Sequence, residues 1–179
     1  MKKKILLTGH KGLLGSKIFK NLSSIYDFDL LDLKSGFDLS DEKKIDNYFK
    51  KNKNYYAVIM AHAYNPQKNK SSNNPLKINS DEVRKYMETN LITCFNICRY
   101  YILNNKKGRI INISSIYGVV SPNHKLYGNS FKHIGYALSK SSIIMLTKYL
   151  ANLYSPNFLI NCLVIGGIYN SKINKKFIK

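Results

Sequence analysis

The chain has few of the residues that cross-link or brace many other classes of protein. Its 179 residues include three cysteines and no tryptophan. Three cysteines cannot form a disulfide framework, so we expect a reducing, intracellular setting. Cys94 and Cys98 lie four positions apart within a predicted helix, where packing in the core is favoured over a metal site.

The chain also lacks a long hydrophobic run. Its basic residues 2–4 precede an apolar stretch that ends at Thr8 and Gly9. A signal peptide needs an apolar stretch of about 7–15 residues, and a membrane helix needs about 20. We therefore expect a cytoplasmic protein with neither a signal peptide nor a membrane span.

Acidic residues are scarce as well. Ten Asp and Glu stand against 29 Lys and Arg, which gives a formal net charge of +19. Such a charge is compatible with nucleic-acid binding. However, only three of these basic residues are arginine, the residue that base and phosphate recognition favours. Because the lysines are also scattered along the whole chain, a specific nucleic-acid partner is not expected.

Short apolar runs alternate with longer amphipathic segments along the chain. Strands are predicted at 4–8, 28–32, 36–39, 56–61, 109–113 and 158–164, and helices that end near 22, 51, 103 and 154. This alternation predicts right-handed βαβ units. The expected fold is α/β, a doubly wound, mostly parallel sheet of about six strands with helices on both faces. The length predicts a single domain over residues 1–179.

A glycine-rich turn follows the first predicted strand. It reads Thr8-Gly9-His10-Lys11-Gly12-Leu13-Leu14-Gly15 and opens the first helix. Glycines there allow a tight turn and a close approach of the backbone to a pyrophosphate, while the helix N-terminus offers N–H groups to the anion. The pattern alone also fits an ordinary turn between strand and helix. Its place after the first strand favours a nucleotide site.

Asp32 ends the second predicted strand. Its distance from the glycine turn is close to the spacing of about 20 residues at which a carboxylate accepts hydrogen bonds from an adenosine ribose. That carboxylate would repel a 2′-phosphate and favours NAD, whereas Lys11 could pair with the phosphate and favours NADP. Both cofactors stay open. The alternative interpretation of Asp32 is a solvated strand end.

A third group of residues lies further along the chain. Ser115 follows the strand predicted at 109–113, and Tyr136 and Lys140 share one face of a predicted helix at positions i and i+4. An ammonium beside a phenol lowers the pKa of the phenol from about 10 toward neutrality. Such a tyrosine can exchange a proton with an alcohol or carbonyl oxygen. By itself the pair could be a chance occurrence in a chain with 14 tyrosines.

The order of these groups resembles the short-chain dehydrogenase/reductase family, and the resemblance spans essentially the whole chain. It implies a Rossmann fold and an NAD(P)-dependent oxidoreductase. It also implies that Tyr136 is the acid/base, that Lys140 lowers the pKa of Tyr136 and holds the nicotinamide ribose, and that Ser115 orients the substrate oxygen. Asn90 would complete a proton relay.

The resemblance further implies a cofactor site without a metal ion. The cofactor would be NAD, with NADP as the alternative, and Asp38 resembles the family's adenine-contacting Asp. The implied cofactor-binding residues are Gly9, Lys11, Gly12, Leu14, Gly15, Asp32, Asp38, Ala61, Tyr136, Lys140 and Gly166.

Two segments narrow the resemblance. Residues 115–118 and 161–168 look like parts of oxidoreductases of bacterial surface-polysaccharide and flagellin-glycan biosynthesis. This similarity implies a small-molecule substrate that is a sugar or a nucleotide sugar. A homo-oligomer is also possible.

Other segments depart from the family. Ala61-His62-Ala63-Tyr64 stands where the family usually has Asn-Asn-Ala-Gly, and the chain ends at Lys179, before the family's last strand and substrate-covering lid. A lid excludes water and completes the substrate site. The alternative hypothesis is therefore a nucleotide-binding protein without catalytic activity.

Overall fold

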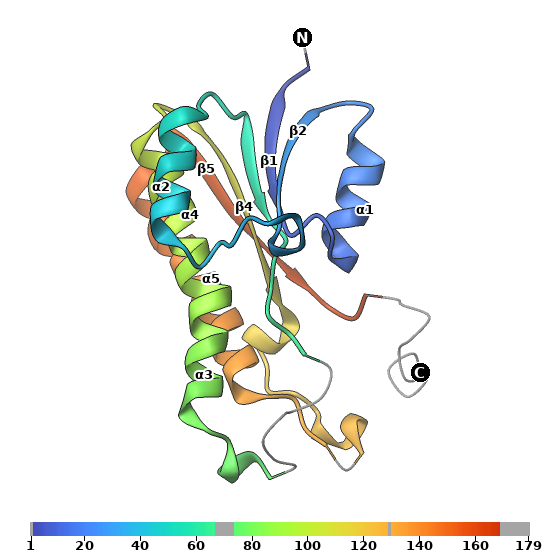
Figure 1. Ribbon diagram of the computed structural model, residues 1–179. Helices are drawn as coiled ribbons and strands as arrows, with labels where there is room; N and C mark the ends of the chain where they lie inside the picture. The colour runs from blue at the N-terminus through green and yellow to red at the C-terminus, as the bar shows by residue number, and fades with distance from the viewer. Residues whose placement is uncertain (1, 67–73, 129, 169–179) are drawn as a thin grey trace.

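The computed structural model describes residues 2–66, 74–128 and 130–168. Its strands are β1 (Lys4–Thr8), β2 (Asp27–Leu31), β3 (Ala57–Met60), β4 (Gly108–Ser115) and β5 (Phe158–Ile165). Its helices are α1 (Leu13–Leu22), α2 (Glu42–Lys51), α3 (Ser80–Met87), α4 (Thr93–Leu103) and α5 (Ile134–Tyr154) (Figure 1). Within these residues, none of the helices has the length and hydrophobicity needed to span a membrane.

The described strands form one parallel sheet in the order β2-β1-β3-β4-β5. The order reverses at β1, because β2 pairs with one side of it and β3 with the other. In doubly wound sheets, ligands bind at the carboxyl ends of the strands beside such a reversal. The predicted doubly wound α/β fold is confirmed.

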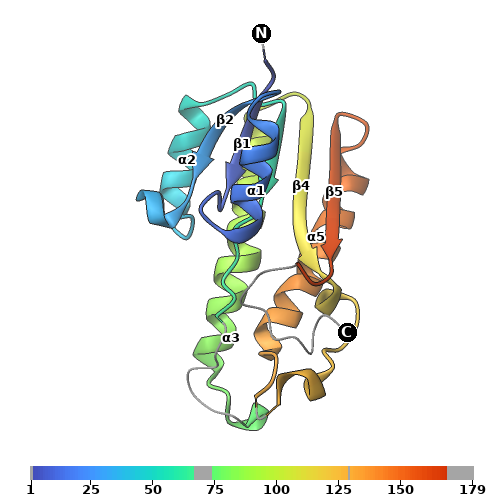
Figure 2. The same ribbon diagram turned by 90° about the vertical axis from the view of Figure 1, so that its right-hand side faces the viewer.

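Both faces of the sheet are covered, which explains the continuous apolar runs in its strands. Ile5 and Leu7 of β1 pack in a cluster with α1 on one face. Leu6, between them, packs on the other face in a cluster that includes residues of α2, α4 and α5. Figure 2 shows α1 standing in front of β1. The expectation of helices on both faces is confirmed.

The brief extended piece predicted at 36–39 is not a strand. The Asp32 side chain accepts a hydrogen bond from the Lys34 N–H and caps a 3₁₀ turn at Leu33–Ser35. Gly36 ends this turn with φ 85°, a left-handed conformation that favours glycine. The chain therefore turns after β2 instead of extending, and the described sheet has five strands rather than about six.

The long helix predicted to end near 103 is irregular in its middle. A π-helical turn at Glu88–Ile92 joins α3 to α4. The Thr93 hydroxyl donates a hydrogen bond to the Thr89 carbonyl at 2.6 Å. Asn90 is fully buried within the turn. Such turns are rare in helices and are frequent at functional sites.

Candidate active site

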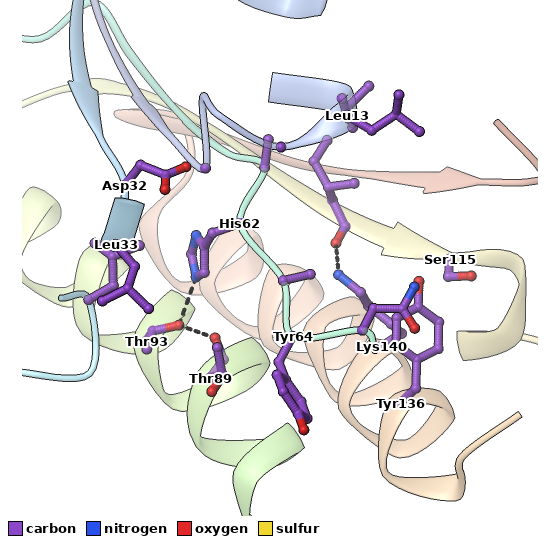
Figure 3. A pocket seen from close by; sticks show the side chains of 18 of the residues that line it. Leu13, Asp32, Leu33, His62, Tyr64, Thr89, Thr93, Ser115, Tyr136 and Lys140 are labelled. Carbon is purple, nitrogen blue, oxygen red and sulfur yellow. Dashed lines mark hydrogen bonds between the residues drawn. The ribbon is translucent and has the colours of Figure 1, made fainter. Parts of the chain in front are cut away.

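A cavity of about 740 Å³ opens at the carboxyl edge of the sheet. The predicted site residues that line it are Gly9, Gly12, Leu14, Asp32, Asp38, Ala61, Ser115, Tyr136, Lys140 and Gly166. Figure 3 shows Asp32 on one side of the cavity and Tyr136 on the other. Among the described residues, Lys11, Gly15 and Asn90 are the predicted site residues that lie outside its lining. The fold therefore brings most of the predicted site together.

The glycine turn is shaped by close backbone contacts. Gly9 has φ 70°, and a Cβ at this position would lie 2.5 Å from the backbone of His62. A Cβ at Gly15 would lie 2.2 Å from the Gly9 carbonyl oxygen. Helix α1 begins after Gly12 without a side-chain cap, so the N–H groups of its first turn can bind an anion. Gly15 thus allows α1 to pack closely against Gly9, although Gly15 does not line the cavity.

Asp32 joins the end of β2 to the glycine turn. Its Oδ2 accepts a hydrogen bond from the Lys11 N–H at 3.0 Å, and its Oδ1 accepts one from the Lys34 N–H at 2.8 Å. The residue is only 8% exposed, so the alternative of a solvated strand end is wrong. The Lys11 ammonium donates to the Lys34 carbonyl at 3.3 Å. That contact holds the Lys11 side chain outside the cavity lining.

Asp38 provides a second carboxylate on the same side of the cavity. Its Oδ1 accepts hydrogen bonds from the N–H of Ser40 at 2.9 Å and from the Ser40 hydroxyl at 2.7 Å. These hydrogen bonds lower the pKa of Asp38 below its usual value. The carboxylate is therefore charged at neutral pH.

His62 links β1 to α4 below the glycine turn. Its Nδ1 lies 2.6 Å from Thr8 Oγ1, and its Nε2 lies 2.7 Å from Thr93 Oγ1. Because the Thr93 hydroxyl donates its proton to the Thr89 carbonyl, it accepts the His62 Nε2–H. Nδ1 then accepts the proton of the Thr8 hydroxyl. Burial lowers the pKa of His62 to about 3, so the ring is neutral at pH 7.

Lys140 and Tyr136 lie together on α5, but their electrostatics differ from the prediction. The Lys140 Nζ donates to the Ile113 carbonyl at 2.8 Å and lies 5.9 Å from the centroid of the Tyr136 ring. Burial raises the pKa of Tyr136 above its usual value, and a hydrogen bond with Ser115 opposes this shift. The predicted lowering of this pKa is therefore wrong, because the Lys140 ammonium points at a carbonyl and not at the phenol oxygen.

The two serines that end β4 have different partners. Ser114 Oγ donates to the Lys140 carbonyl at 2.6 Å and so ties α5 to β4. Ser115 Oγ accepts the Tyr117 N–H at 3.2 Å and also interacts with the Tyr136 phenol. The second serine thus lies beside the phenol.

Asn90 holds the wall of the cavity. Its Oδ1 accepts the Tyr64 N–H at 2.6 Å, and its Nδ2 donates to the Tyr64 carbonyl at 3.1 Å and to Ser139 Oγ at 3.0 Å. The side chain therefore contacts Tyr64 and Ser139 instead of Lys140. A role of Asn90 in a proton relay stays a prediction.

A family model of short chain dehydrogenases matches residues 31–179. The chain belongs to the short-chain dehydrogenase family. Its structure is similar to that of a short chain dehydrogenase from Leptospira borgpetersenii with bound NAD+. The two chains are 25% identical with a TM-score of 0.84, and the match covers 99% of this chain and 76% of the other.

Two further structures resemble this short-chain dehydrogenase in fold. The aldohexose dehydrogenase of Thermoplasma acidophilum, in ligand-free form, has a TM-score of 0.69 and 18% identity over 92% of this chain and 66% of its own. A gluconate 5-dehydrogenase from Burkholderia cenocepacia, in complex with NADP and tartrate, has a TM-score of 0.74 and 16% identity, covering 93% and 72%. No curated protein matches the chain.

Two residues of this short-chain dehydrogenase shape the site but gave no clear signal in the sequence. A Cβ at Gly118 would lie 2.7 Å from the Lys140 carbonyl carbon, so this glycine lets the turn after β4 pack directly on α5. Lys132 Nζ lies 3.9 Å from the Tyr136 ring centroid. An isolated glycine in a loop is a weak signal. Lys132 is an even weaker signal, because lysines occur along the whole chain.

Proposed function

We propose that this chain is an NAD(P)-dependent oxidoreductase that transfers hydride between the nicotinamide and a sugar-like alcohol or ketone. One observation carries the proposal: a single cavity joins two different kinds of site. We call the side with the glycine turn, Asp32 and Asp38 the nucleotide end. The side with Ser115 and Tyr136, where Lys140 also lies, is the reacting end. The NAD+ bound to the Leptospira relative supports the proposal.

The nucleotide end fits a dinucleotide. Gly9 and Gly15 pack so closely on neighbouring backbone that a Cβ at either position would strike it, as expected for the tight turn and close helix packing of a dinucleotide-binding glycine turn. The first turn of α1 has no acidic residue and no side-chain cap to compete for its N–H groups. The buried carboxylate of Asp32 favours a ribose with a free 2′-hydroxyl, so we propose NAD over NADP.

The residues of the reacting end can handle the proton of the reaction. The nicotinamide, when bound, supplies or accepts the hydride. Because its pKa is raised, the Tyr136 phenol is protonated at neutral pH, which is the state that donates a proton to a carbonyl oxygen. The Ser115 hydroxyl would hold that oxygen beside the phenol. Lys140, fixed by the Ile113 carbonyl, lies on the same side of α5, with its Nζ 5.9 Å from the Tyr136 ring centroid.

The finer expectation, a role in surface-polysaccharide or flagellin-glycan biosynthesis, finds no support among the relatives and stays a prediction. A sugar-like substrate is kept in the proposal because the predicted motifs imply it. The names of the Thermoplasma and Burkholderia relatives describe sugar or sugar-acid dehydrogenases.

A Tyr136→Phe variant tests the mechanism. We would titrate NAD+ and NADP+ by calorimetry and follow NADH or NADPH absorbance with aldoses, ketoses and alditols. We expect the variant to lose roughly 10²–10⁴-fold in turnover, the usual contribution of acid–base catalysis, while its affinity for the cofactor changes less than about threefold. Tyr149→Phe, on the exposed side of the same helix, is the matched control and should behave like the wild type.

Two results would contradict the proposal: a wild-type chain that binds neither nucleotide, or normal turnover by Tyr136→Phe. The alternative, nucleotide binding without catalysis, is favoured by the contact of Lys140 with the Ile113 carbonyl, which keeps the ammonium away from the phenol oxygen. Tight cofactor binding without turnover of any tested sugar would support this alternative.

A further inference from the structure

Charge is distributed unevenly along the cavity. Among the described residues that line it, the carboxylates are Asp32 and Asp38, and both belong to the nucleotide end. The charged lining residues beyond that end are Lys85 and Lys140. The described lining around the reacting end therefore carries two cations and no carboxylate.

Lys132, which is not itself among the residues that line the cavity, adds a third cation against the ring of Tyr136. Its Nζ lies 3.9 Å from the Tyr136 ring centroid and donates a hydrogen bond to Asn65 Oδ1. Asn65 itself lines the cavity. Since an ammonium has three donors, the bond to Asn65 leaves donors for a ligand. Burial and the nearby Lys140 lower the pKa of Lys132 to about 8, so the ammonium is still mostly charged at pH 7.

The backbone on both sides of Lys132 is anchored, so its position is fixed. Phe131 and His133 are both buried. His133 Nδ1 accepts the Gly135 N–H at 3.0 Å, and its ring stacks on Tyr86 with centroids 4.5 Å apart. The backbone that carries Lys132 is therefore anchored just before α5, and the hydrogen bond to Asn65 places the ammonium beside the Tyr136 ring.

Lys85 reaches the same region from α3. Its Nζ lies 4.9 Å from the ring centroid of Tyr64, which contacts Tyr86. Tyr86 in turn packs against Tyr136, with ring centroids 6.5 Å apart. Figure 3 shows Tyr64 in the lining of the same cavity as Tyr136 and Lys140. Lys85 thus adds a positive charge to the wall of the same cavity, with the rings of Tyr64 and Tyr86 between it and Tyr136.

We propose that Lys132 binds an anionic group of the substrate, and that the substrate is a sugar acid or a sugar phosphate rather than a neutral sugar. The proposal rests on the proposed function, because it places the reacting carbon of the substrate at Tyr136 and Ser115. The carboxylate or phosphate would accept hydrogen bonds from the remaining Lys132 donors. It would also offset the repulsion among the lysines.

Calorimetric binding to the full chain with saturating NAD+ tests this inference. The bound nucleotide occupies the glycine turn, so that anions are measured at the reacting end. The probes are D-glucose, D-gluconate and D-glucose 6-phosphate. We expect at least one anionic probe to bind ten times or more tighter than glucose. Whichever of the two anions binds more tightly identifies a carboxylate or a phosphate as the group that is recognised.

Variants assign the preference to one side chain. Lys132→Gln should weaken binding of the favoured anion at least tenfold and change glucose binding less than threefold, whereas Lys132→Arg should retain most of the preference. Lys125→Gln removes the same charge from an exposed lysine of the same loop and should have no effect. If thermal unfolding shows that Lys132→Gln is not folded, the same binding measurements are made on Lys132→Met, which keeps the apolar part of the side chain.

Three outcomes would overturn the inference: equal affinity for glucose and both anions, no binding of either anion, or an anion preference that Lys132→Gln and Lys132→Met leave intact. All of these are binding results and require no turnover. A protein that shows the preference but fails the Tyr136→Phe test would therefore refute the proposed function and leave only the anion site at Lys132 standing.

Discussion

The two ends of the cavity are built by different means. At the nucleotide end, backbone makes most of the site: a left-handed glycine turn and the N-terminus of α1, joined by one side chain, the Asp32 carboxylate that accepts hydrogen bonds from neighbouring N–H groups. At the reacting end, side chains make the site, and they come from β4, α5 and the segment before α5. The first end depends on shape. The second depends on which hydrogen-bond partner each polar side chain has.

The largest expected effect comes from filling the glycine turn. Gly9→Ala should reduce the free energy of unfolding by about 3–5 kcal/mol. The alanine would be strained in the left-handed backbone conformation of this position, and its Cβ would lie 2.5 Å from the His62 backbone. Gly36→Ala is a matched control with φ 85° and open space around its Cβ, and it should cost only about 1–2 kcal/mol. Urea unfolding measures both. Equal losses would mean that the close approach to His62 does not matter.

The reacting end should respond through turnover instead of stability. Ser115→Ala should reduce turnover roughly 100-fold, because it removes the hydroxyl beside the Tyr136 phenol. Ser114→Ala should cost about 1 kcal/mol of unfolding free energy, from the lost bond to the Lys140 carbonyl, with little change in turnover. Steady-state kinetics and unfolding curves separate the two serines. If Ser114→Ala reduced turnover and Ser115→Ala reduced only stability, the two serines would have the opposite roles.

The smallest expected effect is a pH dependence of stability caused by His62, which lines the same cavity. The unfolded ring binds a proton below about pH 6.5, whereas the folded ring resists protonation down to a pKa of about 3. The contribution of His62 to stability is therefore complete above pH 6.5 and is lost as the pH falls toward 3. Between pH 7 and pH 5 the loss should be about 2 kcal/mol.

Carboxylates titrate in the same range, so the comparison is made against His62→Gln. This variant lacks the titrating ring and should show a correspondingly flatter dependence of unfolding free energy on pH. Parallel curves for the two proteins would show that His62 is not the group responsible.

Prediction from sequence succeeded where local pattern decides the structure. The apolar runs of β1 and β3 are buried on both faces, and the glycine spacing places Gly9 and Gly15 against each other. The i, i+4 spacing correctly put Tyr136 and Lys140 on one side of α5, at the cavity. These features depend on neighbours along the chain and on backbone geometry.

Prediction failed where a partner distant in sequence decides. Nothing in the segment around Lys140 shows that its ammonium is bound by the carbonyl of Ile113 on β4, and this contact leaves the pKa of Tyr136 raised. The extended piece at 36–39 failed for a local reason, since the side chain of Asp32 caps a turn at Leu33–Ser35 that Gly36 ends. Lys132 gave no signal because its proximity to Tyr136 results from how the chain enters α5.

The π-helical turn at Glu88–Ile92 has a mechanical consequence. From the Thr89 carbonyl, one continuous relay of hydrogen bonds runs through the hydroxyl of Thr93 and the imidazole of His62 to the hydroxyl of Thr8. Deleting a single residue from that turn would rotate the following helix by about 100° and break the relay at its origin. A length change inside one helix would then loosen the support of Thr8, the residue that leads into the glycine turn.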